Sequence, residues 1–182
     1  MRLLQPLILE GPNKSGKSTL RRRLTDLFGF PFFHTGGPKR DAVELGAAVI
    51  AACNAEPSII DRHPCISQPV YDRALGRPQW FTELELGGSL AELTPCPIVL
   101  YCRPPFDMLC KLELKQSPNR INDHDVEIEQ NYVKIVHEYD RTIARYTARN
   151  WIRTIHYNWV EHDHWKWFEG LAATLKESAC VE

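Results

Sequence analysis

Gly11-Pro12-Asn13-Lys14-Ser15-Gly16-Lys17-Ser18 is the stretch of this chain that decides its fold. It fits the pattern G-x-x-x-x-G-K-[ST], in which the backbone N–H groups of a glycine-rich loop surround phosphate groups. The apolar segment Leu7-Ile8-Leu9 precedes it and has the length of a buried strand, and Leu20 and Leu24 follow it at helical spacing. The motif therefore lies between a predicted strand and a predicted helix, which is the context it requires.

The same motif predicts what the loop binds. Lys17 can reach the terminal phosphates of a nucleoside triphosphate, and the Ser18 hydroxyl can hold Mg²⁺. A nucleoside triphosphate and Mg²⁺ are therefore the expected ligands of the loop. The residues that we expect around the donor nucleotide are Asn13, Lys14, Ser15, Gly16, Lys17, Ser18 and Thr19.

The composition is typical of a soluble globular protein, with 43% hydrophobic and 25% charged residues in a chain of 182. This length predicts a single domain over 1–182. No apolar run approaches the length of a membrane span, and the N-terminal segment is interpreted as a first strand rather than a cleavable signal. Six cysteines without a C-x-x-C pair indicate reduced thiols in a cytoplasmic enzyme. The formal net charge of −1 provides no global attraction to nucleic acid.

Apolar runs and helical spacings alternate along the rest of the chain. Predicted strands lie at 31–34, 58–61, 97–102 and 152–157, and predicted helices at 41–52, from 104–105 onward, at 128–146 and around 167–175. Between 63 and 95 the prolines predict an irregular segment with one helical stretch near 80–85, ended by Gly87-Gly88-Ser89.

Two helices allow more detailed predictions. In the helix over 41–52 we expect Val43, Ala47 and Ile50 to face the core. In the longest helix, a stripe at intervals of three and four residues is also expected to be core. That stripe comprises Ile128, Tyr132, Ile135, Tyr139, Ile143 and Tyr146.

The run His162-Asp163-His164 could form a metal site, but a helix N-cap by the aspartate explains it more simply.

Strands alternating with helices predict an α/β fold with a parallel sheet covered on both faces. Ligands bind such sheets beyond the carboxyl ends of the strands. The phosphate loop, the Gly36-Gly37 turn, Asp61-Arg62 and Arg103 each follow a predicted strand, so we expect them to gather at one edge. Asp61 is placed to support Mg²⁺ directly or through water, and the Arg62 guanidinium suits bidentate phosphate binding.

The order of these motifs resembles thymidylate kinases and their bacteriophage-type nucleotide kinase relatives. The motifs concerned are the phosphate loop, Thr35-Gly36-Gly37 after the second strand, Asp61-Arg62-His63 after the third and Tyr101-Cys102-Arg103-Pro104-Pro105 at the end of the fourth. The resemblance implies one P-loop kinase domain with the three-layer, NMP-kinase-like fold, built on a five-stranded parallel sheet. It also implies transfer of the ATP γ-phosphoryl group to a nucleoside monophosphate.

Several site residues follow from the resemblance alone. Arg62 would bind the acceptor phosphate, and Asp61 would serve the metal and the acceptor. Lys14 falls where some family members have a catalytic arginine, and Arg120 lies in a candidate lid over 115–125. The remaining acceptor contacts that it implies are Gly37, Ser67 and Tyr71. Relatives of this kind are frequently homodimers.

Three functions stay open on the sequence. The favoured one is a kinase for a deoxynucleoside monophosphate, thymidylate or a related pyrimidine nucleotide, with 63–95 as a candidate acceptor-binding insertion. The second is a kinase that phosphorylates a hydroxyl, on a deoxynucleoside or on a hydroxymethylated base in DNA. In that case Asp61 or Glu10 would act as the base, and Arg21 to Arg23 could guide the DNA backbone. The third is a nucleotide-binding switch without catalysis.

Overall fold

The computed structural model describes residues 3, 5–35, 37, 39–93, 95–113, 123–161 and 164–177. Five parallel strands form one sheet in the order β2-β3-β1-β4-β5. The strands are β1 (Leu7–Glu10), β2 (Phe32–His34), β3 (Ile59–Asp61), β4 (Ile98–Cys102) and β5 (Arg153–Tyr157). The five-stranded parallel sheet predicted from the sequence is thereby confirmed.

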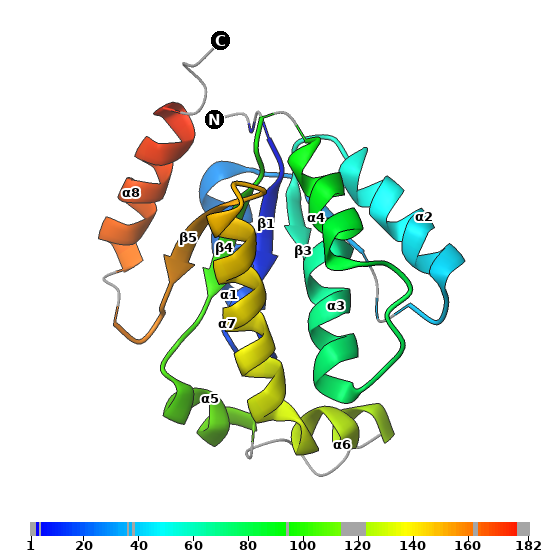
Figure 1. Ribbon diagram of the computed structural model, residues 1–182. Coiled ribbons are helices and arrows are strands. Elements are labelled where there is room, and N and C mark those ends of the chain that lie inside the picture. Colours follow the sequence, from blue (N-terminus) through cyan, green and yellow to red (C-terminus); the bar gives the residue numbers. More distant parts are fainter. Residues whose placement is uncertain are drawn as a thin grey trace.

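Eight helices connect and cover these strands in the described part of the chain. They are α1 (Lys17–Phe28), α2 (Ala42–Cys53), α3 (Pro64–Leu75), α4 (Glu83–Ala91), α5 (Phe106–Glu113), α6 (Asp123–Gln130), α7 (Tyr132–Ala148) and α8 (His164–Glu177). In Figure 1, α7 crosses in front of the sheet and α1 behind it, while α5 and α6 lie beyond the end toward which the strand arrows point.

The central strands are apolar because both faces of the sheet are buried, and β1 and β4 have no exposed residue. Ile8, Ile60 and Val99 pack on one face with residues of α3, α4 and α7. Leu7, Leu9 and Leu100 pack on the other face with residues of α1 and α8. Successive side chains of a strand point to opposite faces, so each strand contributes to both cores and the fold has three layers.

The prediction of an irregular segment over 63–95 is wrong in most of its length. It contains α3, which begins with His63 as N-cap and Pro64 in the first turn and ends at Gly76 in the left-handed region. It also contains α4, which begins with a capping box between Thr82 and Glu85. Pro64 therefore opens α3 and Pro69 is tolerated within it.

The Gly87-Gly88-Ser89 run does not end the helix near 80–85, because these residues lie inside α4. A Cβ atom at Gly87 would lie 2.0 Å from ring atoms of Trp151. Gly87 is therefore required by the close packing of α4 against an indole, rather than by a turn.

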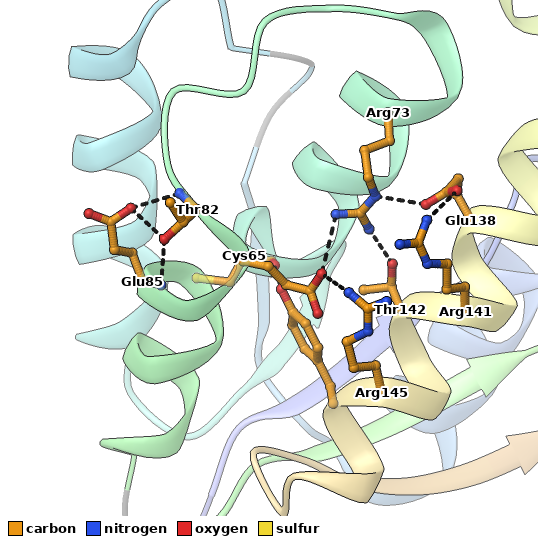
Figure 2. Close-up of polar contacts among 10 residues, drawn as sticks. Cys65, Arg73, Thr82, Glu85, Glu138, Arg141, Thr142 and Arg145 are labelled. Atoms are coloured by element: carbon orange, nitrogen blue, oxygen red, sulfur yellow. Dashed lines mark hydrogen bonds and ion pairs between the residues drawn. The ribbon is translucent and has the colours of Figure 1, made fainter.

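A polar network joins α3, α4 and α7 (Figure 2). Arg73 of α3 donates from Nε to Glu138 at 2.7 Å and from Nη2 to Thr142 at 2.5 Å, both on α7. Glu83 of α4 lies 3.8 Å from Arg73 and accepts from Arg145 of α7 at 2.5 Å. Because the side chains of Arg73, Glu83 and Glu138 are at most 20% exposed, the network fixes the position of α3, which carries candidate acceptor residues.

The predicted buried face of α2 is wrong. Val43 is 81% exposed, Ile50 is 62% exposed and Ala47 is exposed as well, whereas Leu45 and Ala52 are buried. The helix itself is confirmed, with Asp41 as N-cap accepting from Glu44 N at 2.8 Å. Almost every side chain of α2 is apolar, so its sequence contains little contrast between the two faces.

The predicted longest helix is two helices, α6 and α7, with Asn131 between them. Its apolar stripe is buried as expected, from Ile128 to Tyr146.

Positions 162 and 163 lie outside the described residues, so the proposed N-cap is not tested. Among the residues that the structure describes, no cluster of His, Cys, Asp and Glu could hold a metal and no helix could cross a membrane. The thiols of Cys53, Cys65, Cys96 and Cys102 are free.

Candidate active site

The phosphate loop connects β1 to α1 in a strained backbone conformation. Gly11 has φ 138° and Gly16 has φ 94°, and the non-glycine residue Lys14 has φ 60°. A Cβ atom at Gly11 would lie 2.3 Å from the Cys102 carbonyl oxygen, so this position has room only for glycine. The loop then enters α1 at Lys17, where the N-terminal amides of a helix attract anions.

Lys17 is buried and folds back onto its own loop. Its ammonium donates to Gly11 O at 2.8 Å, to Pro12 O at 2.6 Å and to Ser15 Oγ at 3.3 Å. Burial, together with repulsion from Arg62, lowers the pKa of Lys17 to about 7. An incoming phosphate would therefore replace carbonyl partners and would stabilise the charged form of this side chain.

Arg62 lies next to the loop although it is distant in sequence. It follows β3 with φ 65°, and its N–H donates to Leu9 O of β1 at 3.1 Å. Its guanidinium donates from Nη2 to Asn13 Oδ1 at 2.7 Å and from Nη1 to Tyr139 Oη at 2.5 Å. The Tyr71 ring lies 5.2 Å from the guanidinium carbon. Arg62 thus bridges the phosphate loop, α3 and α7.

Glu10 lies fully buried at the end of β1. Its Oε1 atom accepts from His63 N at 2.7 Å, while Oε2 has no hydrogen-bond partner among the described residues. Burial raises the pKa of Glu10 from 4.5 to about 7, against the attraction of Arg62 and Lys17. This enclosed carboxyl therefore orients the start of α3 through His63. It is not accessible to a substrate as a base.

We expect Glu10→Gln to remove a pH dependence of stability. The folded-state pKa lies above the unfolded-state value, so between pH 4.5 and about 7 only the folded state keeps the Glu10 proton, and stability falls as pH rises. Glutamine can still accept from His63 N and does not titrate. The unfolding free energy of the wild type should therefore fall by roughly 2 kcal/mol from pH 5 to pH 7 through Glu10, and the variant should not show this fall. Urea unfolding at both pH values measures this change, and a constant difference would contradict it.

Asp61 and Ser18 carry the oxygen atoms that would hold a magnesium ion. Asp61 is the last residue of β3, and its carboxylate lies 3.7 Å from Arg21 Nη1. Arg21 follows Ser18 by three residues on α1, so Ser18 and the Asp61 carboxylate lie on the same side of that helix. Ser18 is exposed, and a hydroxyl with a carboxylate is a donor set that Mg²⁺ accepts.

The other predicted site residues divide into three groups. Tyr71 joins Arg62 at the loop, because its hydroxyl lies 3.4 Å from Asn13 Oδ1. Ser67 does not, since its hydroxyl donates to His63 O at 3.1 Å within α3. Lys14 and Thr19 are exposed on the loop and at the start of α1.

Three further predictions concern the rim of the site. Gly37 borders open space: apart from its chain neighbours, no described heavy atom would lie within 4 Å of a Cβ atom at this position. Arg120 and most of the candidate lid, 115–122, lie outside the described residues. Arg103, which we expected at the same edge, forms an ion pair with Asp140 of α7, with hydrogen bonds of 2.8 and 3.0 Å.

Sequence reasoning missed three side chains that shape the site. Tyr132 donates to Asn13 O at 2.6 Å, Tyr139 accepts from Arg62, and Thr35 donates to Arg62 O at 2.5 Å. Both tyrosines were interpreted as core, and their rings are indeed buried. A buried tyrosine hydroxyl needs a polar partner, and that requirement is the signal that could have indicated their second role.

The sequence matches no protein-family model and no curated protein sequence. Its fold, in contrast, matches solved structures. The YorR protein from Bacillus subtilis, solved in complex with phosphorylated GDP, matches with a TM-score of 0.77 and 16% identity over 98% of this chain and 99% of that chain. The deoxyadenosine kinase from M. mycoides, solved with bound dATP, matches with a TM-score of 0.59 and 16% identity over 93% of this chain and 98% of that chain. The chain therefore has the α/β fold of P-loop nucleotide kinases.

Proposed function

We propose that the protein transfers the γ-phosphoryl group of ATP to a deoxynucleoside monophosphate, with a thymidylate-like pyrimidine nucleotide favoured. The observation that carries this proposal is the position of Arg62. Its guanidinium is hydrogen-bonded to Asn13 of the phosphate loop, and no carboxylate in the described part of the chain forms an ion pair with it. A guanidinium whose partners are an amide and a hydroxyl can exchange them for an acceptor phosphate.

The residues on the two sides of the loop have separate tasks in this reaction. Lys17 leaves the Gly11 and Pro12 carbonyls and neutralises the donor phosphates. Arg62 binds and orients the acceptor phosphate, and Tyr71 packs beside it. Because the nucleophile is already an anionic phosphate oxygen, positioning and charge neutralisation are sufficient and no strong base is needed.

Ser18 and Asp61 are the residues that would hold Mg²⁺, which neutralises phosphate charge when bound. Segment 115–125 remains our candidate lid over the phosphates. The segment 63–95 contributes to the acceptor side through Tyr71 of α3, which supports its role as an acceptor-binding insertion. Cytoplasmic location and a homodimer stay predictions.

A hydroxyl acceptor is the second candidate function, and two observations favour it. One of the similar folds belongs to a deoxyadenosine kinase. An open hollow also runs along α1 from Ser18, lined by Arg21, Arg22 and Phe32 among others, and it could take the backbone of a DNA acceptor. The enclosure of Glu10 and the ion pair of Asp61 weigh against this function, because it needs an accessible base.

An acceptor panel tests the proposal. We expect radiolabelled γ-phosphate to pass from ATP to dTMP or another deoxynucleoside monophosphate, and the transfer to stop when EDTA removes Mg²⁺. Free deoxynucleosides and hydroxymethyluracil-containing DNA are offered in parallel reactions and resolved by chromatography. Label found only in DNA or only in nucleosides would replace the proposal by the second candidate. ATP binding without transfer to any acceptor would indicate a nucleotide-binding switch.

A further inference from the structure

The connection that follows β5 brings a tryptophan to the phosphate loop. Arg103 N donates to Tyr157 O at 2.9 Å, so β5 ends level with β4 at the carboxyl edge of the sheet. Asn158 then turns the chain, because its Oδ1 atom accepts from Val160 N at 3.1 Å. Trp159 lies in this turn.

The indole of Trp159 packs directly against Gly16. A Cβ atom at Gly16 would lie 2.8 Å from Cδ1 and 3.2 Å from Nε1 of that ring. Gly16 also has φ 94°, which side chains disfavour. The backbone conformation of the loop and the contact with the indole therefore both require glycine, and Trp159 limits where the loop can lie.

The indole N–H of Trp159 is buried and has no hydrogen-bond partner among the described residues. Trp167, on α8, shows the usual arrangement, since its Nε1 donates to His156 O at 3.0 Å. Buried N–H groups nearly always have a partner in folded proteins, so an unpartnered one beside a binding loop indicates a donor that a ligand completes.

The loop must change when it binds phosphate. Lys17 now donates to Gly11 O and Pro12 O, and a bound nucleotide needs that ammonium for its own phosphates. Trp159 packs against Gly16, directly before Lys17, so a rearrangement of the loop also changes the surroundings of the indole. We propose that Trp159 is a positioning residue for the donor: its ring packs against Gly16, and its indole N–H donates to an oxygen of the bound nucleoside di- or triphosphate. This inference rests on the proposed function only in that the loop binds a donor nucleotide.

Calorimetric titration of the whole protein with ADP tests this inference, using Trp159→Phe and the matched control Trp167→Phe. Each variant keeps an aromatic ring and loses one indole N–H. In the wild type, the Trp167 N–H donates to a backbone carbonyl, whereas the Trp159 N–H has no partner among the described residues. We expect Trp159→Phe to weaken ADP binding roughly tenfold, as for a lost hydrogen bond to a charged group, and Trp167→Phe to change it less than about twofold. Intrinsic fluorescence should also respond to ADP in the wild type and the control, and lose most of that response in Trp159→Phe.

Equal ADP affinity and an equal fluorescence response in Trp159→Phe and wild type would overturn the inference. Failure of the wild type to bind ADP would overturn it together with the proposed function. ADP binding that depends on Trp159, without phosphoryl transfer to any acceptor, would contradict the proposed function and support the inference. Circular dichroism melting curves of both variants establish that they fold.

Discussion

Lys17→Met is expected to reduce phosphoryl transfer by roughly 10³-fold or more, the range found when a main cation of a phosphoryl-transfer site is removed. Lys17 is the one residue of the loop whose ammonium is held in place by three loop oxygens before any ligand arrives. Methionine has a similar length and no charge, so the variant removes the cation and retains the packing. Initial rates with saturating ATP and the best acceptor of the panel measure the effect.

The same variant should not lose stability. The folded-state pKa of Lys17, about 7, lies below its unfolded-state value of 10.5, so the buried amine costs stability as pH falls below 10.5, and this cost reaches its full size below about pH 7. Lys17→Met removes this cost, and we expect its melting temperature at pH 6 to equal or exceed that of the wild type. A lower melting temperature would assign the loss of activity to misfolding, and activity near the wild-type level would contradict the role of Lys17.

The strands and the loop were predictable because their signals are local. β1, β3 and β4 are short apolar runs, as expected for strands buried on both faces, and the loop motif fixes the element before it and the element after it. The expectation that Arg62 and the phosphate loop lie at the same edge of the sheet is met as well, since β1 and β3 are neighbours and Arg62 contacts Asn13.

Helices α2, α3 and α4 were harder to predict because tertiary contacts override local signals there. Gly87 indicates a turn by itself, yet the Trp151 ring needs a residue without Cβ at that point of α4. Pro69 is tolerated inside α3, which Arg73 joins to α7. In α2, apolar residues occupy all sides, so a periodic pattern could be fitted to the wrong face.

The acceptor side of the site could be predicted only in part. Tyr132 and Tyr139 belong to an apolar stripe, and helical spacing cannot distinguish a tyrosine that only packs from one whose hydroxyl reaches Asn13 or Arg62. That distinction depends on the crossing of α7 over the sheet, which brings residues more than 70 positions apart into contact. The candidate site therefore includes more of α7 than its motifs indicate.

Arg62→Lys is expected to lower kcat/KM for the acceptor roughly 10²-fold while changing the KM for ATP much less. Lysine keeps the charge but provides one ammonium in place of a planar fork. It cannot hold Asn13 through one nitrogen and Tyr139 through the other, nor bind two phosphate oxygens in parallel. The φ of 65° at this position is equally costly for both residues, so the backbone conformation is not the cause of the loss.

Arg149→Lys is the matched control for this prediction. The Arg149 guanidinium also lies over an aromatic ring, 4.8 Å from the centre of Trp151, but it follows α7 at the amino-end side of the sheet, away from the loop. We expect its acceptor and donor kinetics to equal those of the wild type. Unchanged acceptor kinetics in Arg62→Lys would show that Arg62 acts as a simple charge or only supports Asn13. A parallel increase in the KM for ATP would instead place Arg62 on the donor side, and the acceptor phosphate would then have to bind elsewhere.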